Sequence, residues 1–174
     1  MTTITVLGVC GGSGATTLVG LALIGEEPVD AVVTGHDRRV LADRLGALGQ
    51  RPADPAPALR LIDGGRVDPD RIAASFGAGA LVLAAPVSNT GEAALAATLD
   101  YISLRYSREL LLKIGIVRTE VHGAARPDKN GSGIRIPYDR ALAHGRGLDE
   151  TASLLRRPTL AAARAWTNVL RSRR

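Results

Sequence analysis

The sequence predicts an α/β fold in which helices cover a mostly parallel sheet. Short apolar runs alternate with segments of helical spacing, the order expected of repeated βαβ units. Aromatic residues make up only 3% of the chain, so the core must consist of Val, Ile, Leu and Ala, as in a sheet buried on both faces. The runs that we expect to form strands are Thr2–Val9, Val29–Val33, Leu59–Asp63, Ala80–Ala85 and Leu110–Val117.

The length and composition fit one compact domain that spans residues 1–174. With 45% hydrophobic residues, the chain can bury a core of its own. It has no apolar run of 18 residues and no basic leader, so we expect a soluble, cytoplasmic protein. Its single cysteine, Cys10, cannot form a disulfide within the chain, which agrees with a reducing compartment.

A glycine-rich loop over residues 8–17 follows the first expected strand and leads into a segment of helical spacing, Thr16–Ile24. Glycine tolerates the backbone angles that let N–H groups close around phosphate oxygens, and a helix N-terminus adds partial positive charge. In a P-loop, a lysine followed by Ser or Thr completes this cradle, but Ala15 stands at the lysine position here. The residues that we expect to hold phosphate are Gly11, Gly12, Ser13, Gly14, Ala15, Thr16 and Thr17.

This loop resembles the deviant Walker A motif of the ParA/MinD family, Lys-Gly-Gly-x-Gly-Lys-Thr-Thr. The two lysine positions of that motif are occupied by Cys10 and Ala15, so both cations are missing. The resemblance covers nearly the whole chain and implies a three-layer P-loop NTPase fold of the SIMIBI type, with ATP or ADP and Mg²⁺ as cofactors. The residues that match the motif are Gly11, Gly12, Gly14, Thr16 and Thr17.

Two aspartates follow expected strands and are the candidate catalytic residues. Asp63 ends the third apolar run and resembles the family's Walker B aspartate, which implies that it holds Mg²⁺ together with Thr16. Asp37 falls on one position of an Asp-x-Asp pair that the family places near the phosphates, and Gly35 occupies the other. The alternative for Asp37 is that it caps the helix expected over Arg38–Leu48.

An Ile-Pro-Tyr-Asp segment is the second most specific match to the family. The resemblance implies that Pro137, Tyr138 and Asp139 lie beside the nucleotide base. The family commonly ends the preceding strand in an asparagine that recognises adenine, whereas this chain has Arg118 and Thr119 there. The alternative is that the Ile-Pro-Tyr-Asp segment only closes the sheet.

Positive charge is concentrated in the second part of the chain. Residues 1–100 carry 7 Lys and Arg against 11 Asp and Glu, whereas residues 101–174 carry 15 against 6. A basic region of this kind can meet DNA phosphates or anionic lipid headgroups. The alternative is a solvated, arginine-rich surface without such a partner.

The C-terminal sequence predicts two helices, over Asp149–Arg157 and over residues 158–174, with Pro158 in the first turn of the second. We expect the apolar face of the second helix to pack on the sheet. The resemblance to MinD-like proteins implies an alternative, an amphipathic membrane anchor. The residues of that face are Leu160, Ala163, Trp166, Val169 and Leu170.

The function that these observations predict is that of a degenerate ParA/MinD-like protein with weak or no ATP hydrolysis. It would act as a partition, positioning or scaffold factor, similar to TadZ/CpaE-type proteins that also vary the loop lysine. Its partners would be a second copy or another protein, with DNA or an anionic membrane contacted through the basic region. Its cytoplasmic location would then include association with the nucleoid or the membrane.

Two alternatives to this function stay open at the level of the sequence. One is a genuine ATPase whose missing cation comes from Arg38, Arg39 or a neighbouring subunit. The other is an interaction protein whose loop binds no nucleotide.

Overall fold

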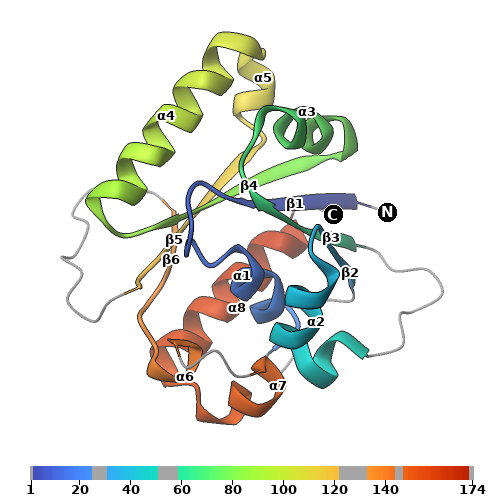
Figure 1. Cartoon of the computed structure of the whole chain (residues 1–174), viewed down its shortest axis with the longest axis vertical. Coiled ribbons are helices and arrows are strands. Elements are labelled where there is room, and N and C mark those ends of the chain that lie inside the picture. The colour runs from blue at the N-terminus through green and yellow to red at the C-terminus, as the bar shows by residue number, and fades with distance from the viewer. Residues whose placement is uncertain (1, 25–30, 51–58, 122–132, 144–146, 173–174) are drawn as a thin grey trace.

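The protein forms a six-stranded sheet in which every neighbouring pair of strands is parallel (Figure 1). The structure is a computed structural model that describes residues 2–24, 31–50, 59–121, 133–143 and 147–172. The strand order is β2-β3-β1-β4-β5-β6, so β1 lies between β3 and β4 in the middle of the sheet. The strands are β1 (Thr2–Gly8), β2 (Ala31–Gly35), β3 (Leu59–Arg66), β4 (Ala80–Pro86), β5 (Ile114–Thr119) and β6 (Ile134–Ile136).

Helices cover both faces of the sheet, which makes three layers. Figure 1 shows α3, α4 and α5 on one face and α1, α2 and α6 to α8 on the other. The first group comprises α3 (Pro69–Ala78), α4 (Asn89–Arg105) and α5 (Arg108–Leu111). The second comprises α1 (Ala15–Leu21), α2 (Arg38–Leu45), α6 (Arg140–Ala143), α7 (Leu148–Thr151) and α8 (Arg157–Ser172), with 3₁₀ turns at Gly46–Gln50 and Ala152–Leu154. The predicted α/β class and three-layer arrangement are therefore confirmed.

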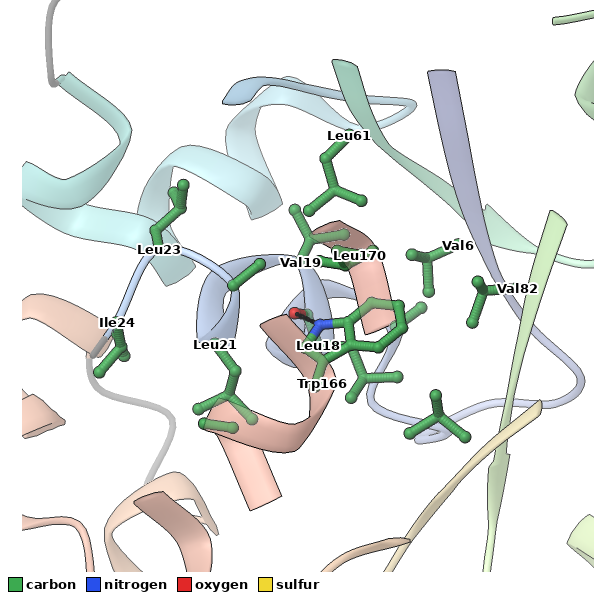
Figure 2. Packing of buried hydrophobic residues seen from close by; sticks show 14 of the residues in the cluster. Val6, Leu18, Val19, Leu21, Leu23, Ile24, Leu61, Val82, Trp166 and Leu170 are labelled. Carbon is green, nitrogen blue, oxygen red and sulfur yellow. Dashed lines mark hydrogen bonds between the residues drawn. The ribbon is translucent and has the colours of Figure 1, made fainter. Parts of the chain in front are cut away.

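The apolar face of α8 packs inside the molecule, and this decides between the two interpretations of the C-terminal helix. Trp166 is 1% exposed, and its indole Nε1 donates a hydrogen bond to the Leu18 carbonyl at 2.9 Å. Figure 2 shows the Trp166 ring lying against α1, with Leu170 beside it and Val6 of the sheet nearby. Because Ala163 is buried as well, the face expected to pack on the sheet is used for packing. None of the described helices is both long and apolar enough to cross a membrane.

Several element boundaries differ from the expected ones. The fifth strand begins at Ile114 rather than Leu110, because its parallel register starts with the pair Leu81 and Ile114 and the preceding residues form α5. The helix expected to run to Leu48 ends at Leu45, since Gly46 takes a positive φ of 56°. Val29 lies outside the described residues, and the second strand begins at Ala31.

The helix predicted over Asp149–Arg157 is shorter and less regular than expected. Its place is taken by the short α7, a 3₁₀ turn and an extended residue, Leu155. The Asp149 carboxylate accepts the backbone N–H of Ala47 at 2.7 Å and of Glu150 at 2.9 Å, which ties this segment to the turn after α2. Those hydrogen bonds, the one from Ala47 first, hold the pKa of Asp149 below its ordinary value. Pro158 does lie in the first turn of α8, as expected.

Candidate functional site

The glycine-rich loop joins the end of β1 to the start of α1 at the carboxyl edge of the sheet. Gly12 and Gly14 have φ angles of 72° and 79°, in the left-handed region that residues other than glycine rarely adopt. The Gly14 carbonyl accepts the Leu18 N–H at 2.9 Å, which begins the helix. A Cβ atom placed on Gly11 or Gly12 would meet nothing within 4 Å. The backbone of the loop therefore faces open space, as a cradle for phosphate requires.

The loop is held in shape by contacts on its inner side. Ser13 is 4% exposed, and its carbonyl accepts the Thr119 hydroxyl of β5 at 2.8 Å. Gly8 leaves room for Ser13, because a Cβ atom on Gly8 would collide with the Ser13 hydroxyl. The conformation of the loop thus depends on β1 and β5 and not on its own sequence alone.

Thr16 and Asp63, the two residues expected to hold a metal ion, lie in contact. The Thr16 Oγ1 donates a hydrogen bond to Asp63 Oδ2 at 2.6 Å, and the Gly65 N–H donates to Asp63 Oδ1 at 3.0 Å. Asp63 is 6% exposed and lies inside β3, which continues to Arg66 and does not end at the aspartate as expected. A hydroxyl and a carboxylate at this spacing fit Mg²⁺, which binds few protein oxygens and completes its shell with phosphate and water.

A cavity of about 450 Å³ opens above the loop. It is bounded by the loop and α1 on one side, by the end of β3 on another, and by residues after β5 and β6 on the third. Its volume is within the range typical of small-molecule sites. The predicted site residues that line it are Gly11, Gly12, Ser13, Gly14, Ala15, Thr16, Thr17, Asp63, Pro137, Tyr138 and Asp139.

Asp37 is the one predicted site residue that does not line this cavity. It is the N-cap of α2, where its Oδ1 accepts the N–H groups of Arg39 at 3.0 Å and Val40 at 3.1 Å. The capping role weighed for it is confirmed, and its catalytic role stays a prediction. Arg38 and Arg39 are exposed on α2 and are also absent from the cavity lining.

The segment Pro137–Asp139 forms the far rim of the cavity, and its polar groups are bound within the protein. Asp139 is 3% exposed and accepts the Thr159 hydroxyl at 2.7 Å and the N–H groups of Arg156 at 2.9 Å and Ala141 at 3.0 Å. Burial by itself raises the pKa of the Asp139 carboxyl, but these hydrogen bonds and the nearby Arg156 charge outweigh it and hold that pKa below the ordinary value. The Asp139 carboxylate therefore fastens α8 to this rim.

Glu120, the residue directly after β5, fixes the same rim. Its Oε1 pairs with Arg135 Nε at 2.5 Å, and its Oε2 accepts the Tyr138 N–H at 3.1 Å. Arg118, two residues earlier, turns away to form an ion pair with Glu92 at 2.9 Å and does not line the cavity.

Arg44 of α2 connects the two rims through hydrogen bonds to one residue of each. Its Nη2 donates to the Thr17 hydroxyl at 3.4 Å and to the Leu142 carbonyl at 2.7 Å. Burial lowers the pKa of this guanidinium from its ordinary value. Thr17 and Leu142 both line the cavity, so Arg44 links two of its walls.

Known proteins resemble this chain in structure and not in sequence. No family model and no curated protein sequence matches it. It is similar to a candidate plasmid partition protein from Borrelia burgdorferi B31 bound to AMPPNP, with 8% identity over 98% of each chain and a TM-score of 0.62. A ParA family ATPase from Chlorobium tepidum TLS shares 14% identity over 97% of this chain and 98% of its own, with a TM-score of 0.62. A Cyanothece McdA variant in complex with ATP shares 14% identity over 98% and 96%, with a TM-score of 0.60.

The chain has a ParA/MinD-like fold. Agreement over nearly the whole length of each chain means that the similarity is not limited to the glycine loop. At these identities the comparison establishes the fold, and the chemistry of the site has to be judged from its own residues.

In this ParA/MinD-like fold the cavity carries little positive charge. Among the described residues, its lining contains three carboxylates, those of Asp63, Glu120 and Asp139, and one guanidinium, that of Arg66. Ala15, which is 7% exposed, presents a methyl group at the position of the P-loop lysine. A phosphate chain would therefore rely on the loop backbone, on α1 and on a divalent cation for most of its charge neutralisation.

Sequence reasoning missed two of the charged residues that line the cavity, Arg66 and Glu120. Arg66 comes three residues after Asp63 and follows a Gly-Gly pair, and this proximity to a candidate metal ligand was the available signal. Glu120 directly follows Thr119, one of the residues noted at the end of the fifth strand, but its link to Arg135 and Tyr138 exists only in three dimensions.

Proposed function

We propose that this protein binds a nucleotide as its Mg²⁺ complex and acts as a ParA/MinD-like partition, positioning or scaffold factor with weak or no ATP hydrolysis. The observation that carries the proposal is the hydrogen bond of 2.6 Å between Thr16 and Asp63 at the foot of an open glycine loop. The similar structures support it, since two of them hold AMPPNP or ATP.

In this proposal, different parts of the cavity wall contact the phosphates, the metal ion and the base. The N–H groups of residues 11–14 and the start of α1 bind the phosphate oxygens. Thr16 and Asp63 hold Mg²⁺, which when bound neutralises charge on the terminal phosphates. Thr17 lines the same wall, while Pro137 and Tyr138 bound the space opposite, where we place the base.

Weak hydrolysis follows from the side chains at the two lysine positions. Phosphoryl transfer depends on positioning and on positive charge placed where negative charge develops. Ala15 and Cys10, which both line the cavity, supply no such charge. Binding relies on backbone donors and the cation and is therefore retained, while turnover is slow.

The basic part of the chain is the proposed contact with DNA or an anionic membrane. Helix α8 contains no acidic residue between Arg157 and Ser172 and carries Arg157, Arg164 and Arg171 at seven-residue spacing. Arginines seven apart lie close to one line along a helix, so they form a basic stripe on the side away from Trp166. We propose in addition that the protein pairs with a second copy or a partner protein, and that it works in the cytoplasm.

The test is calorimetric titration with ATP and ADP, with and without Mg²⁺, combined with phosphate-release assays of the wild type and Ala15→Lys. We expect the wild type to bind the Mg²⁺ complexes, and the lysine variant to release phosphate about a hundredfold faster. Ala15→Met is the matched control, because it adds similar volume without charge. A wild type as fast as Ala15→Lys would contradict the weak-hydrolysis proposal, and no heat at millimolar nucleotide would leave a nucleotide-independent interaction protein.

A further inference from the structure

Arg66 is the one lysine or arginine, among the residues that the structure describes, that lines the cavity. It is the last residue of β3, and its side chain is exposed. It forms no hydrogen bond or ion pair through its guanidinium with any part of the described chain, whereas the carboxylates of Glu120 and Asp139 are both paired. A positive charge without a partner on the wall of a cavity is available to an anion.

The Gly-Gly pair after Asp63 brings Arg66 to this place. A Cβ atom on Gly64 would collide with the Leu7 side chain, and Gly65 has a φ of 70°, so neither position accepts an ordinary side chain without strain. The two glycines let β3 continue past Asp63 through a register shift, so that Arg66 lies opposite Gly8. Gly8 is the residue at which the glycine loop begins.

The backbone on both sides of Arg66 is fixed. The Val67 N–H donates to the Gly8 carbonyl at 2.9 Å, which ties the end of β3 to the start of the loop. Arg71 Nη1 donates to the carbonyls of Gly64 and Arg66, each at 3.0 Å, and Arg71 Nε pairs with Asp68 at 2.7 Å. The side chain of Arg66 is therefore carried by a rigid base next to the phosphate cradle.

We propose that the Arg66 guanidinium binds the β- and γ-phosphates of a nucleoside triphosphate and so strengthens its binding, a contact that neither Ala15 nor Cys10 provides. This inference rests on the proposed function. The planar guanidinium offers two parallel N–H donors to phosphate oxygens, so an arginine on the β3 rim can bind the phosphates of the ligand without occupying the loop position from which a lysine supports hydrolysis. The site then selects ligands by the length of the phosphate chain, with triphosphate bound more tightly than monophosphate.

The test compares the binding of ATP, ADP and AMP, each with Mg²⁺, by wild type, Arg66→Ala, Arg66→Lys and Arg60→Ala. Arg60 is the matched control, because it is an exposed arginine on the same strand but outside the cavity lining. We expect Arg66→Ala to weaken ATP binding about tenfold or more, as for loss of a charge-assisted hydrogen bond. AMP binding should change by less than about threefold, since its single phosphate lies nearer the sugar. Arg66→Lys should keep part of the affinity, and Arg60→Ala should match the wild type.

The possible results separate this inference from the proposed function. If the wild type binds ATP and Arg66→Ala binds it equally well, the assignment of Arg66 is overturned and nucleotide binding stands. Equal losses in Arg60→Ala, or equal losses for ATP and AMP, also overturn it. If the wild type binds none of the three nucleotides, both the proposed function and the inference fail. Thermal unfolding of the four proteins without ligand, expected to agree within about 2 °C, shows that the variants are folded.

Discussion

The two rims of the cavity each carry a segment whose sequence predicted a nucleotide site, yet their polar groups are used differently. On the loop rim, Gly11 and Gly12 face open space, and the Thr16 hydroxyl and the Asp63 carboxylate, the proposed metal ligands, lie in contact on the cavity wall. On the opposite rim, the Asp139 carboxylate accepts three hydrogen bonds from within the protein. The hydrogen-bond partners therefore separate a rim whose backbone is open to the cavity from a rim whose carboxylate holds the fold together.

The largest difference between the two rims is expected when the Asp139 carboxylate is removed. Asp139→Ala leaves the buried Thr159 hydroxyl and two N–H groups without an acceptor, which we expect to lower the free energy of unfolding by about 3 kcal/mol. Chemical denaturation measures this loss, and nucleotide affinity measured well below the unfolding midpoint should change little. A variant that is as stable as the wild type but no longer binds nucleotide would show that Asp139 belongs to the binding machinery.

Asp63 provides the complementary prediction for the loop rim. Asp63→Asn keeps one oxygen for the Gly65 N–H but removes the charge, so the affinity for the Mg²⁺–nucleotide complex should fall about tenfold. Titrations with and without EDTA check this result, because the variant and the wild type should bind alike once the metal is removed. Asp37→Ala is the control, since it removes the N-cap aspartate of α2, which does not line the cavity. Equal loss of affinity in both variants would contradict the assignment of the metal site to Asp63.

The smallest expected effect is a pH dependence that belongs to the Asp139 rim. The pKa of Asp139 is lower in the folded protein than its ordinary 3.8, so the charged form stabilises the fold above that value. The stabilisation is lost as the pH falls through the folded-state pKa, below about pH 4. Denaturant unfolding at a series of pH values, for wild type and Asp139→Asn, should show a difference in stability that shrinks in this acid range. A difference that stays constant down to pH 2.5 would contradict the role given to this carboxylate.

The α8 helix is hydrogen-bonded to both sides of the cavity. Trp166 donates its indole N–H to Leu18, a residue of the helix that follows the glycine loop. The C-terminal helix therefore fastens both rims, through Asp139 and Thr159 on one side and through Leu18 on the other. This double attachment accounts for the burial of the apolar face of α8.

The amino-acid sequence was sufficient for the fold class, the loop and the first five strands. Local rules govern these features, because apolar runs, glycines at positive φ and capping aspartates act over a few residues. It was not sufficient where a boundary depends on a distant partner. The start of the fifth strand at Ile114 is set by its register with Leu81, and the segment at Asp149 is shaped by a hydrogen bond to Ala47.

The spacing of residues 8–17 was enough to predict a phosphate loop that lacks both lysines, since the missing charges can be read directly from Cys10 and Ala15. Only the tertiary structure decided which other charge lies nearby. Arg38 and Arg39 stay on the surface of α2, while Arg66 reaches the cavity because parallel strands bring their carboxyl ends to one edge of the sheet. The proximity of β1 and β3, whose paired residues are nearly sixty positions apart, is a property of the sheet and has no local signal in the chain.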